Sequence, residues 1–350
     1  MKLFVTGGAG FIGSTFIRHV LESNKNYSVV NYDKLTYAAN LANLRNVAED
    51  PRYRFTKGDI CDVGEVEVAM RGCDAVVHFA AESHVDRSIY EPTPVIETNV
   101  TGTFVLLQVA RRIGIKRFIH ISTDEVYGDL SPGTLATEKT PLQPSSPYSS
   151  SKAAADLLVL SFVRTYGFPA LVTRSSNNYG PRQFPEKFLP LMITNAFVGK
   201  PLPIYGDGMQ QRDWLHVDDN CIGILAVLER GRIGEIYHIG GMDVEENLTM
   251  AKRVLRAVGK PETLLTFVKD RPGHDRRYAL DCSKAEAELD WKRMISLDEG
   301  LRRTIEWYES NPDWLASVNA GEYRSYYEKY YDNRDSSLRA LAPAEPKTLH

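Results

Sequence analysis

The chain has 350 residues, of which 43% are hydrophobic and 25% charged, and its formal net charge is −3. This composition predicts a globular protein with one large α/β domain and a smaller lobe, and the weak charge gives no case for a nucleic-acid or membrane surface. No apolar run reaches the roughly 18–20 residues of a membrane span, and a first strand at Lys2 leaves no room for a signal peptide. The four cysteines are scattered, which favours free thiols in a reducing cytoplasm over disulfides or a metal site.

A glycine-rich turn opens the chain. The apolar run 2–6 predicts a buried strand, and an amphipathic stretch over 14–21 predicts a helix. Between them, Gly7, Gly10 and Gly13 are spaced three apart. Such glycines allow a tight turn, a close approach to a pyrophosphate and the packing of helix on strand, with the phosphates at the helix N-terminus. A turn without a ligand is the alternative, but the strand before it and the helix after it favour a dinucleotide site.

An aspartate ends the second predicted strand. Residues 27–32 form that strand, and Asp33 follows 20 residues after Gly13. A carboxylate at this position accepts hydrogen bonds from the ribose hydroxyls and repels a 2′-phosphate, which selects NAD over NADP. Lys34 comes next and weakens this preference, and an exposed turn aspartate is the alternative reading.

Two further strands are expected to border the cofactor. The third runs from Phe55 to Ile60 and the fourth covers 75–81. The small side chains at the end of the fourth strand let a cofactor lie close to the backbone. The residues expected at the adenine and along the cofactor are Asp59, Ile60, Ala80 and Ala81.

The polar stretch 82–88 follows directly, at the strand edge where ligands bind in parallel sheets. Ser83 is a candidate contact for substrate or cofactor, although a solvated helix start explains the stretch equally well. A helix predicted over 95–112 contains Thr98 and Asn99. Asn99 is placed either to organise a proton relay or to act as a satisfied core asparagine.

The centre of the sequence is Ser122-Thr123-Asp124-Glu125-Val126-Tyr127-Gly128, which follows a fifth strand over 117–122. A loop rich in Pro, Ser and Thr then leads to a helix from Tyr148 to about Tyr166. Tyr148 and Lys152 are four residues apart, so both project from one face of that helix.

The second half breaks the alternation of strand and helix at 177–182. We predict a Rossmann domain over 1–176, joined again by 215–242, a sugar-nucleotide lobe over 177–330 and a polar tail over 331–350. The remaining predicted elements are strands over 170–174 and 235–240 and helices over 184–203, 220–229, 248–258 and 297–308.

These motifs together resemble the extended short-chain dehydrogenase/reductases. The residues that carry the resemblance are Thr6 to Gly13, Tyr148-x-x-x-Lys152, Asn177-Asn178-Tyr179-Gly180-Pro181 and Arg212-Asp213-Trp214. Within that family the chain is similar to the dTDP-glucose 4,6-dehydratases over about residues 1–330, through 122–128 and the run 80–88. The resemblance implies a doubly wound Rossmann sheet, NAD, dTDP-glucose as substrate, and a homodimer through a four-helix bundle built from the helices near Val95 and Tyr148. Ser149-Ser150-Ser151 departs mildly from the family pattern, and the tail has no counterpart in it.

The resemblance also implies two sets of binding residues. The expected cofactor contacts are Gly7, Gly10, Phe11, Ile12, Gly13, Asp33, Lys34, Leu35, Thr36, Asp59, Ile60, Phe79, Ala80, Ala81, Ser83, Thr98, Tyr148, Lys152 and Asn178. The expected substrate contacts are Ser83, Thr123, Asn177, Lys187, Phe188, Pro203, Tyr205, Arg212, Asn247, Arg271 and His274. Arginine and lysine suit the oxygens of a diphosphate, although each alone is also explained as an exposed charge.

The catalytic hypothesis rests on five residues. A phenol with an ordinary pKa of about 10 is a poor base, and the ammonium of Lys152 together with a nicotinamide charge is expected to lower the pKa of Tyr148. Tyr148 then takes the proton of a sugar hydroxyl that Thr123 orients. Glu125 is expected to remove the C5 proton and Asp124 to protonate the leaving C6 hydroxyl, because two adjacent carboxyls tend to hold different protonation states.

Three other functions remain open from the sequence. A sugar-nucleotide 4-epimerase shares the cofactor motif and the Tyr148–Lys152 pair but leaves Asp124 and Glu125 unexplained. A 4,6-dehydratase for UDP-glucose or GDP-mannose differs mainly in its base pocket. A regulator that senses NAD without catalysis has no need of Tyr148 and Lys152.

Overall fold

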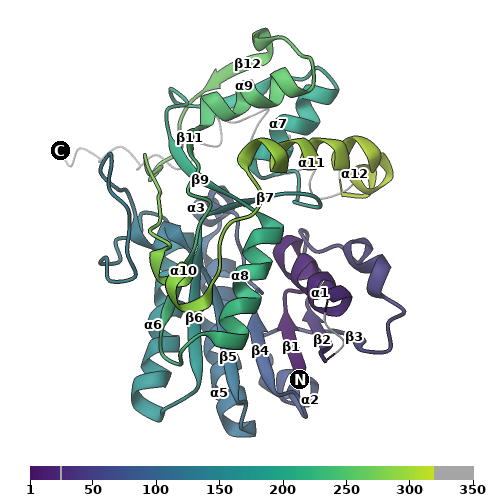
Figure 1. Ribbon diagram of the computed structural model, residues 1–350, viewed down its shortest axis with the longest axis vertical. Coiled ribbons are helices and arrows are strands. Elements are labelled where there is room, and N and C mark those ends of the chain that lie inside the picture. The colour runs from purple at the N-terminus through teal and green to yellow at the C-terminus, as the bar shows by residue number, and fades with distance from the viewer. Residues whose placement is uncertain (24–25, 319–350) are drawn as a thin grey trace, which may run out of the picture.

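A computed structural model of the protein describes residues 1–23 and 26–318. Its centre is a parallel seven-stranded sheet in the order β10-β6-β5-β4-β1-β2-β3 (Figure 1). The strands are β1 (Lys2–Thr6), β2 (Ser28–Asp33), β3 (Tyr53–Lys57), β4 (Ala75–His78), β5 (Arg117–Thr123), β6 (Ala170–Ser175) and β10 (Ile236–Ile239). The predicted doubly wound Rossmann fold is confirmed.

Alternating side chains of the strands build a core on each face of the sheet. In β1, Leu3 and Val5 enter the cluster with α1 (Phe11–Ser23) and α8 (Val217–Arg230), whereas Phe4 faces the opposite cluster. That second cluster contains residues of α2 (Val63–Met70), α5 (Thr103–Ile113) and α6 (Pro147–Tyr166). Because successive strand residues point to opposite faces, a run of consecutive apolar residues is what a sheet covered on both sides requires.

The helix predicted over 95–112 is interrupted. Helix α4 (Pro92–Ile96) leads into a π-helical turn, η2 (Glu97–Gly102), which continues as α5. Short α3 (Val85–Tyr90) precedes α4. Such π turns within helices are rare and are frequent at functional sites. Here the turn carries Thr98 and Asn99, the two polar residues that the sequence singles out.

The second lobe packs at the end of the sheet where the parallel strands finish, and Figure 1 shows its helices gathered above the sheet. Its sheets are β11-β9-β7 and β12-β8, formed by β7 (Asn177–Tyr179), β8 (Leu202–Tyr205), β9 (Gln211–His216), β11 (Val244–Glu246) and β12 (Leu265–Val268). Its helices are α7 (Phe188–Phe197), α9 (Asn247–Ala257), α11 (Leu297–Ser310) and α12 (Pro312–Val318). Helix α10 (Ser283–Leu289) packs against α8 and β10 instead.

Several predicted boundaries are wrong. The helix expected over 184–203 is α7, which ends at Phe197 because a turn with left-handed Gly199 and strand β8 follow. The third strand lies at Tyr53–Lys57 rather than 55–60, and the fourth ends at His78 rather than 81. The predicted tail over 331–350 lies outside the described residues, and the division into two domains stays a prediction. Within the described ranges, no helix is both long and apolar enough to cross a membrane.

Candidate active site

The glycine turn between β1 and α1 is compact for a visible steric reason. Gly7 has a φ of +67°, and a Cβ there would lie 2.6 Å from the backbone nitrogen of Ala80. A Cβ on Gly13 would lie 2.4 Å from the carbonyl oxygen of Gly7. Larger residues at either position would push β1, α1 and the segment after β4 apart. The turn therefore brings the N-terminus of α1, with its unpaired N–H groups, to the floor of a cavity.

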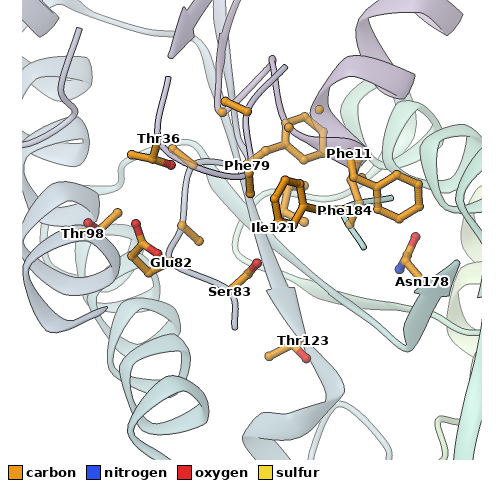
Figure 2. A pocket seen from close by; sticks show the side chains of 18 of the residues that line it. Phe11, Thr36, Phe79, Glu82, Ser83, Thr98, Ile121, Thr123, Asn178 and Phe184 are labelled. Carbon is orange, nitrogen blue, oxygen red and sulfur yellow. The ribbon is translucent and has the colours of Figure 1, made fainter. Parts of the chain in front are cut away.

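This first cavity has a volume of about 320 Å³ and runs along the ends of the central strands. Figure 2 shows Thr36, Thr98 and Glu82 on one side and Asn178 and Phe184 on the other, with Phe79 and Ile121 between them. The predicted residues that line it are Gly7, Gly10, Phe11, Ile12, Gly13, Asp33, Lys34, Thr36, Asp59, Ile60, Phe79, Ala80, Ala81, Ser83, Thr98, Thr123, Asp124, Glu125, Tyr148, Lys152, Asn177, Asn178 and Lys187. Leu35 was also expected here but does not line the cavity. Its backbone N–H instead donates to Oδ1 of Asp33 at 2.8 Å.

Asp33 is held at the mouth of the cavity by backbone groups. Its Oδ2 accepts the N–H of Ala9 at 2.9 Å. Burial raises the pKa of Asp33, and the backbone hydrogen bonds from Leu35 and Ala9 oppose that rise. Lys34 forms an ion pair with Asp59 at 2.6 Å. Lys34 was expected to weaken the preference against a 2′-phosphate. It is therefore paired with an acidic side chain, Asp59, that lines the same cavity.

The two adjacent carboxyls lie in short 3-10 helix η3 (Asp124–Tyr127), directly after β5. Burial raises the pKa of Asp124 well above its ordinary value, and the neighbouring Glu125 adds to the rise. Burial also raises the pKa of Glu125, but Arg271, Arg212 and Lys187 oppose it. The two carboxyls thus have different electrostatic surroundings, because three cations act on Glu125 and an anion acts on Asp124. This difference favours a proton on Asp124 and a charge on Glu125.

Tyr148 and Lys152 come from the first turns of α6, which begins with a capping box at Ser146. The ammonium of Lys152 donates to the carbonyl oxygen of Ile121 at 2.7 Å, and burial lowers the pKa of Lys152 to about 8. The expected lowering of the pKa of Tyr148 is not produced by the protein groups alone. Burial raises that pKa and the two carboxyls of η3 add to the rise, whereas the side chain of Thr123 opposes it.

A second cavity of about 160 Å³ continues into the other lobe. The predicted residues that line it are Asn177, Lys187, Phe188, Pro203, Tyr205, Arg212, Asn247, Arg271 and His274. The guanidinium of Arg212 donates to the backbone oxygens of Gln211 and Asp275 at 2.8 Å each, which fixes its direction. Glu125 lines both cavities, so the two carboxyls of η3 stand where the cavities meet.

The alternatives left open for Asn99 are resolved by its contacts. Its Oδ1 accepts the N–H of Glu82 at 2.9 Å, and its Nδ2 donates to the carbonyl of Glu82 and to the hydroxyl of Ser151. Asn99 is buried and its polar groups are satisfied, so it fixes the segment after β4 against α6.

The sequence missed several residues of the site. Glu186 lines both cavities and accepts a hydrogen bond from Arg87 at 3.1 Å. Ser122 and Ser176 line the first cavity, and Asp86 and Tyr278 line the second. Ser122 lies at the end of β5, and this position was the one signal that would have identified it.

Comparison with known proteins gives consistent results. A family model described as GDP-mannose 4,6 dehydratase matches residues 4–304. The dTDP-glucose 4,6-dehydratase of Salmonella typhimurium is 48% identical, with 95% of this chain and 100% of the relative covered. The enzyme of that name from Haemophilus influenzae is 52% identical, with 89% and 98% covered.

Among solved structures, the dTDP-glucose 4,6-dehydratase DesIV from Streptomyces venezuelae, with NAD and TYD bound, is 49% identical and superposes with a TM-score of 0.89. That match covers 91% of this chain and 100% of DesIV. The similarity therefore extends over both lobes and both cavities. The chain belongs to the dTDP-glucose 4,6-dehydratase family.

Proposed function

We propose that the protein catalyses the NAD-dependent dehydration of dTDP-glucose to dTDP-4-keto-6-deoxyglucose, as a hydro-lyase. The observation that carries this proposal is the pair of adjacent carboxyls, buried Asp124 and half-buried Glu125, at the junction of the two cavities beside Tyr148. A hydride transfer alone needs no such pair. An elimination of water needs both a base and an acid next to the oxidised carbon.

The first cavity fits NAD. The glycine turn leaves the backbone open to a pyrophosphate, and Asp33 stands where a ribose would lie. Oδ1 of Asn178 and Oγ of Ser122 are buried without a hydrogen-bond partner among the described residues, although both belong to the cavity lining. Buried polar atoms of this kind call for a polar ligand. NAD supplies the hydride acceptor at C4 of the sugar and later returns the hydride to C6.

Oxidation at C4 requires a proton acceptor, and Tyr148 fills this role. Thr123 lines the same cavity as Tyr148 and would orient the same sugar hydroxyl. Because burial and the two carboxyls raise the pKa of Tyr148 in the protein alone, a bound nicotinamide would have to supply the positive charge that stabilises the phenolate beside Lys152. Lys152 is also placed to hold the nicotinamide ribose.

Elimination uses the pair in η3. Once C4 is a ketone, the C5 proton is acidic and Glu125, whose charged form three nearby cations favour, removes it. Asp124 is kept protonated by burial and gives its proton to the C6 hydroxyl, which leaves as water. After the hydride reaches C6, Glu125 returns the proton to C5. Tyr148 then holds the proton taken from the C4 hydroxyl and Asp124 lacks the one given to water, so passing one proton from Tyr148 to Asp124 restores the site.

The second cavity would hold the nucleotide. Arg212, Lys187 and Arg271 supply positive charge for a diphosphate, and Tyr205 and Phe188 offer rings to the base or ribose. The solved DesIV complex with NAD and TYD supports this division of the site. A 4-epimerase, or a dehydratase for UDP-glucose or GDP-mannose, remains the second choice.

The protein is further proposed to be a cytoplasmic homodimer. Phe104 on α5 and Leu157 and Tyr166 on α6 are 38%, 58% and 51% exposed. Together they give the α5–α6 surface an apolar character that a second copy would cover as a four-helix bundle.

A substrate panel tests the proposed reaction. The protein is incubated in turn with dTDP-glucose, UDP-glucose and GDP-mannose, and the mass of each product is measured by mass spectrometry. We expect loss of one water from dTDP-glucose in preference to the others. A product of unchanged mass with an inverted C4 would favour the epimerase.

A further inference from the structure

A carboxylate from one lobe holds two side chains of the other. Asp86, in α3, accepts a hydrogen bond from Nη1 of Arg271 at 2.7 Å through Oδ1 and one from the hydroxyl of Tyr205 at 2.8 Å through Oδ2. The side chains of Asp86 and Arg271 are only 6% and 17% exposed. Charge-assisted hydrogen bonds in such surroundings fix direction more strongly than surface ion pairs do.

The two side chains that Asp86 holds, Tyr205 and Arg271, lie at the ends of two neighbouring strands. Strands β8 and β12 pair in parallel, with Tyr205 opposite Val268 at their ends. The loop that carries Arg271 follows directly and is folded back by Asp270, which accepts the N–H of Arg271 at 2.8 Å. Asp86 therefore stands across the ends of both strands and faces the second cavity together with Tyr205 and Arg271.

Arg271 has a competing acidic neighbour. Burial works to lower the pKa of Arg271, but Asp86 and then Glu125 oppose it, and the net direction is upward. Arg271 is in turn the foremost cation acting on Glu125. After Asp86, the acidic group that acts most strongly on this guanidinium is Glu125, the proposed catalytic base.

We propose that Asp86 is a positioning residue that holds Arg271 toward the diphosphate of the substrate and away from Glu125. The inference rests on the proposed binding of a nucleoside diphosphate sugar in the second cavity. Nη1 of Arg271 is occupied by Asp86, and its Nε is buried with no hydrogen-bond partner among the described residues. That nitrogen remains available to a phosphate oxygen.

The direction in which the affinity for a diphosphate changes distinguishes a positioning role of Asp86 from a simple effect of its charge. Removing a negative charge from the cavity would strengthen the binding of a diphosphate if only net charge mattered. Removing the group that fixes Arg271 weakens it. Isothermal titration calorimetry of dTDP into the NAD-loaded full-length protein should show Asp86→Asn binding roughly tenfold to hundredfold more weakly, by analogy with the loss of a partner that orients a metal ligand. Unchanged or tighter binding would overturn the proposal.

A control with the same change of charge, at a more exposed ion pair, is available in the lobe that carries Arg271. Asp298 accepts from Nη1 of Arg253 at the same 2.7 Å, away from both cavities. Asp298→Asn should leave the affinity for dTDP, the bound NAD and the KM unchanged. Asp86→Asn should raise the KM for dTDP-glucose by a larger factor than it lowers kcat, with bound NAD unchanged. A loss of NAD or a loss in kcat alone would mark Asp86 as structural.

A double-mutant cycle guards against misfolding of the single variant. Arg271→Gln alone leaves the charge of Asp86 without its cation, whereas the pair Asp86→Asn with Arg271→Gln removes both charges of this contact. If Asp86 acts through Arg271, the double variant binds dTDP no more weakly than Arg271→Gln does, and any further weakening in the double variant contradicts the proposal. Binding needs no turnover, so a protein that binds dTDP but fails to dehydrate dTDP-glucose refutes the proposed function while this test still stands.

Discussion

The hydroxyl of Thr123 donates to Oδ1 of Asp124 at 3.2 Å. The same Thr123 oxygen accepts the backbone N–H of the next residue of η3, also at 3.2 Å, so its orientation is fixed. Oδ2 of Asp124 is then the buried oxygen that has no hydrogen-bond partner among the described residues. A proton on Asp124 therefore belongs on Oδ2, where it can be given to a leaving hydroxyl.

Replacing the proposed base separates the two halves of the reaction. Glu125→Gln keeps the size of the side chain but cannot accept the C5 proton. Loss of a positioned base typically costs about 10²–10⁴ in rate, so water loss should slow by that factor while oxidation at C4 continues. Reduced cofactor should accumulate on the protein and be visible by its absorbance. Dehydration at the wild-type rate would exclude Glu125 as the base.

Asp124→Asn should change stability with a defined dependence on pH. Because burial raises the folded-state pKa of Asp124 above 3.8, the folded protein binds this proton more tightly than the unfolded chain does. That contribution is fully present below about pH 3.8 and is lost as pH rises through the folded-state pKa. Asparagine does not ionise, so the melting temperature of the variant should rise relative to that of the wild type as the pH increases above about 4. Parallel melting curves at every pH would contradict the raised pKa, and dehydration should be lost in either case.

Lys152→Met should lower the activity but raise the stability of the folded protein at pH 7. The pKa of Lys152 falls from 10.5 to about 8 on burial, so holding its charge in the folded protein costs on the order of 3 kcal/mol at pH 7. Between pH 8 and 10.5 the unfolded chain still binds this proton and the folded protein does not, so the wild type gains stability there. In cofactor-free protein, the variant should be more stable at pH 7, with the difference shrinking toward pH 10.5. Denaturant titrations at several pH values measure this, and a difference that does not change with pH would refute it.

The dimer proposal can be tested by placing a charge on α6. Leu157→Glu puts a carboxylate on the exposed apolar surface of α5 and α6, which should yield a folded monomer in sedimentation measurements. Val198→Glu is the control, because Val198 is 69% exposed at the end of α7 in the other lobe. An unchanged dimer in the first variant, or dissociation in both, would argue against this interface.

Features that depend on neighbouring residues could be predicted from the sequence. The glycine turn, Asp33 at the end of β2 and the Tyr148–Lys152 spacing all follow from local steric and helical rules. The strand ends were placed less well. Ala80 and Ala81 were assigned to the fourth strand, although β4 ends at His78 and both alanines lie in the loop at the cavity.

Features that depend on distant residues could not be predicted. Asp86 and Arg271 are 185 residues apart, and neither position has a periodicity that points to the other. The pKa of Tyr148 was expected to fall because of Lys152 and a nicotinamide charge, but in the protein alone burial and two carboxyls raise it. The strength of burial at a site is set by packing of both lobes and has no local signature in the sequence.

The central claim is that one site oxidises, dehydrates and re-reduces the same sugar. The most direct test uses dTDP-glucose with deuterium at C4, NAD-loaded protein and no added cofactor, with the product analysed by mass spectrometry and NMR. The account predicts a product lighter by one water, with the deuterium moved to C6. Recovery of unchanged substrate, together with conversion of UDP-glucose to its galactose epimer, would contradict it.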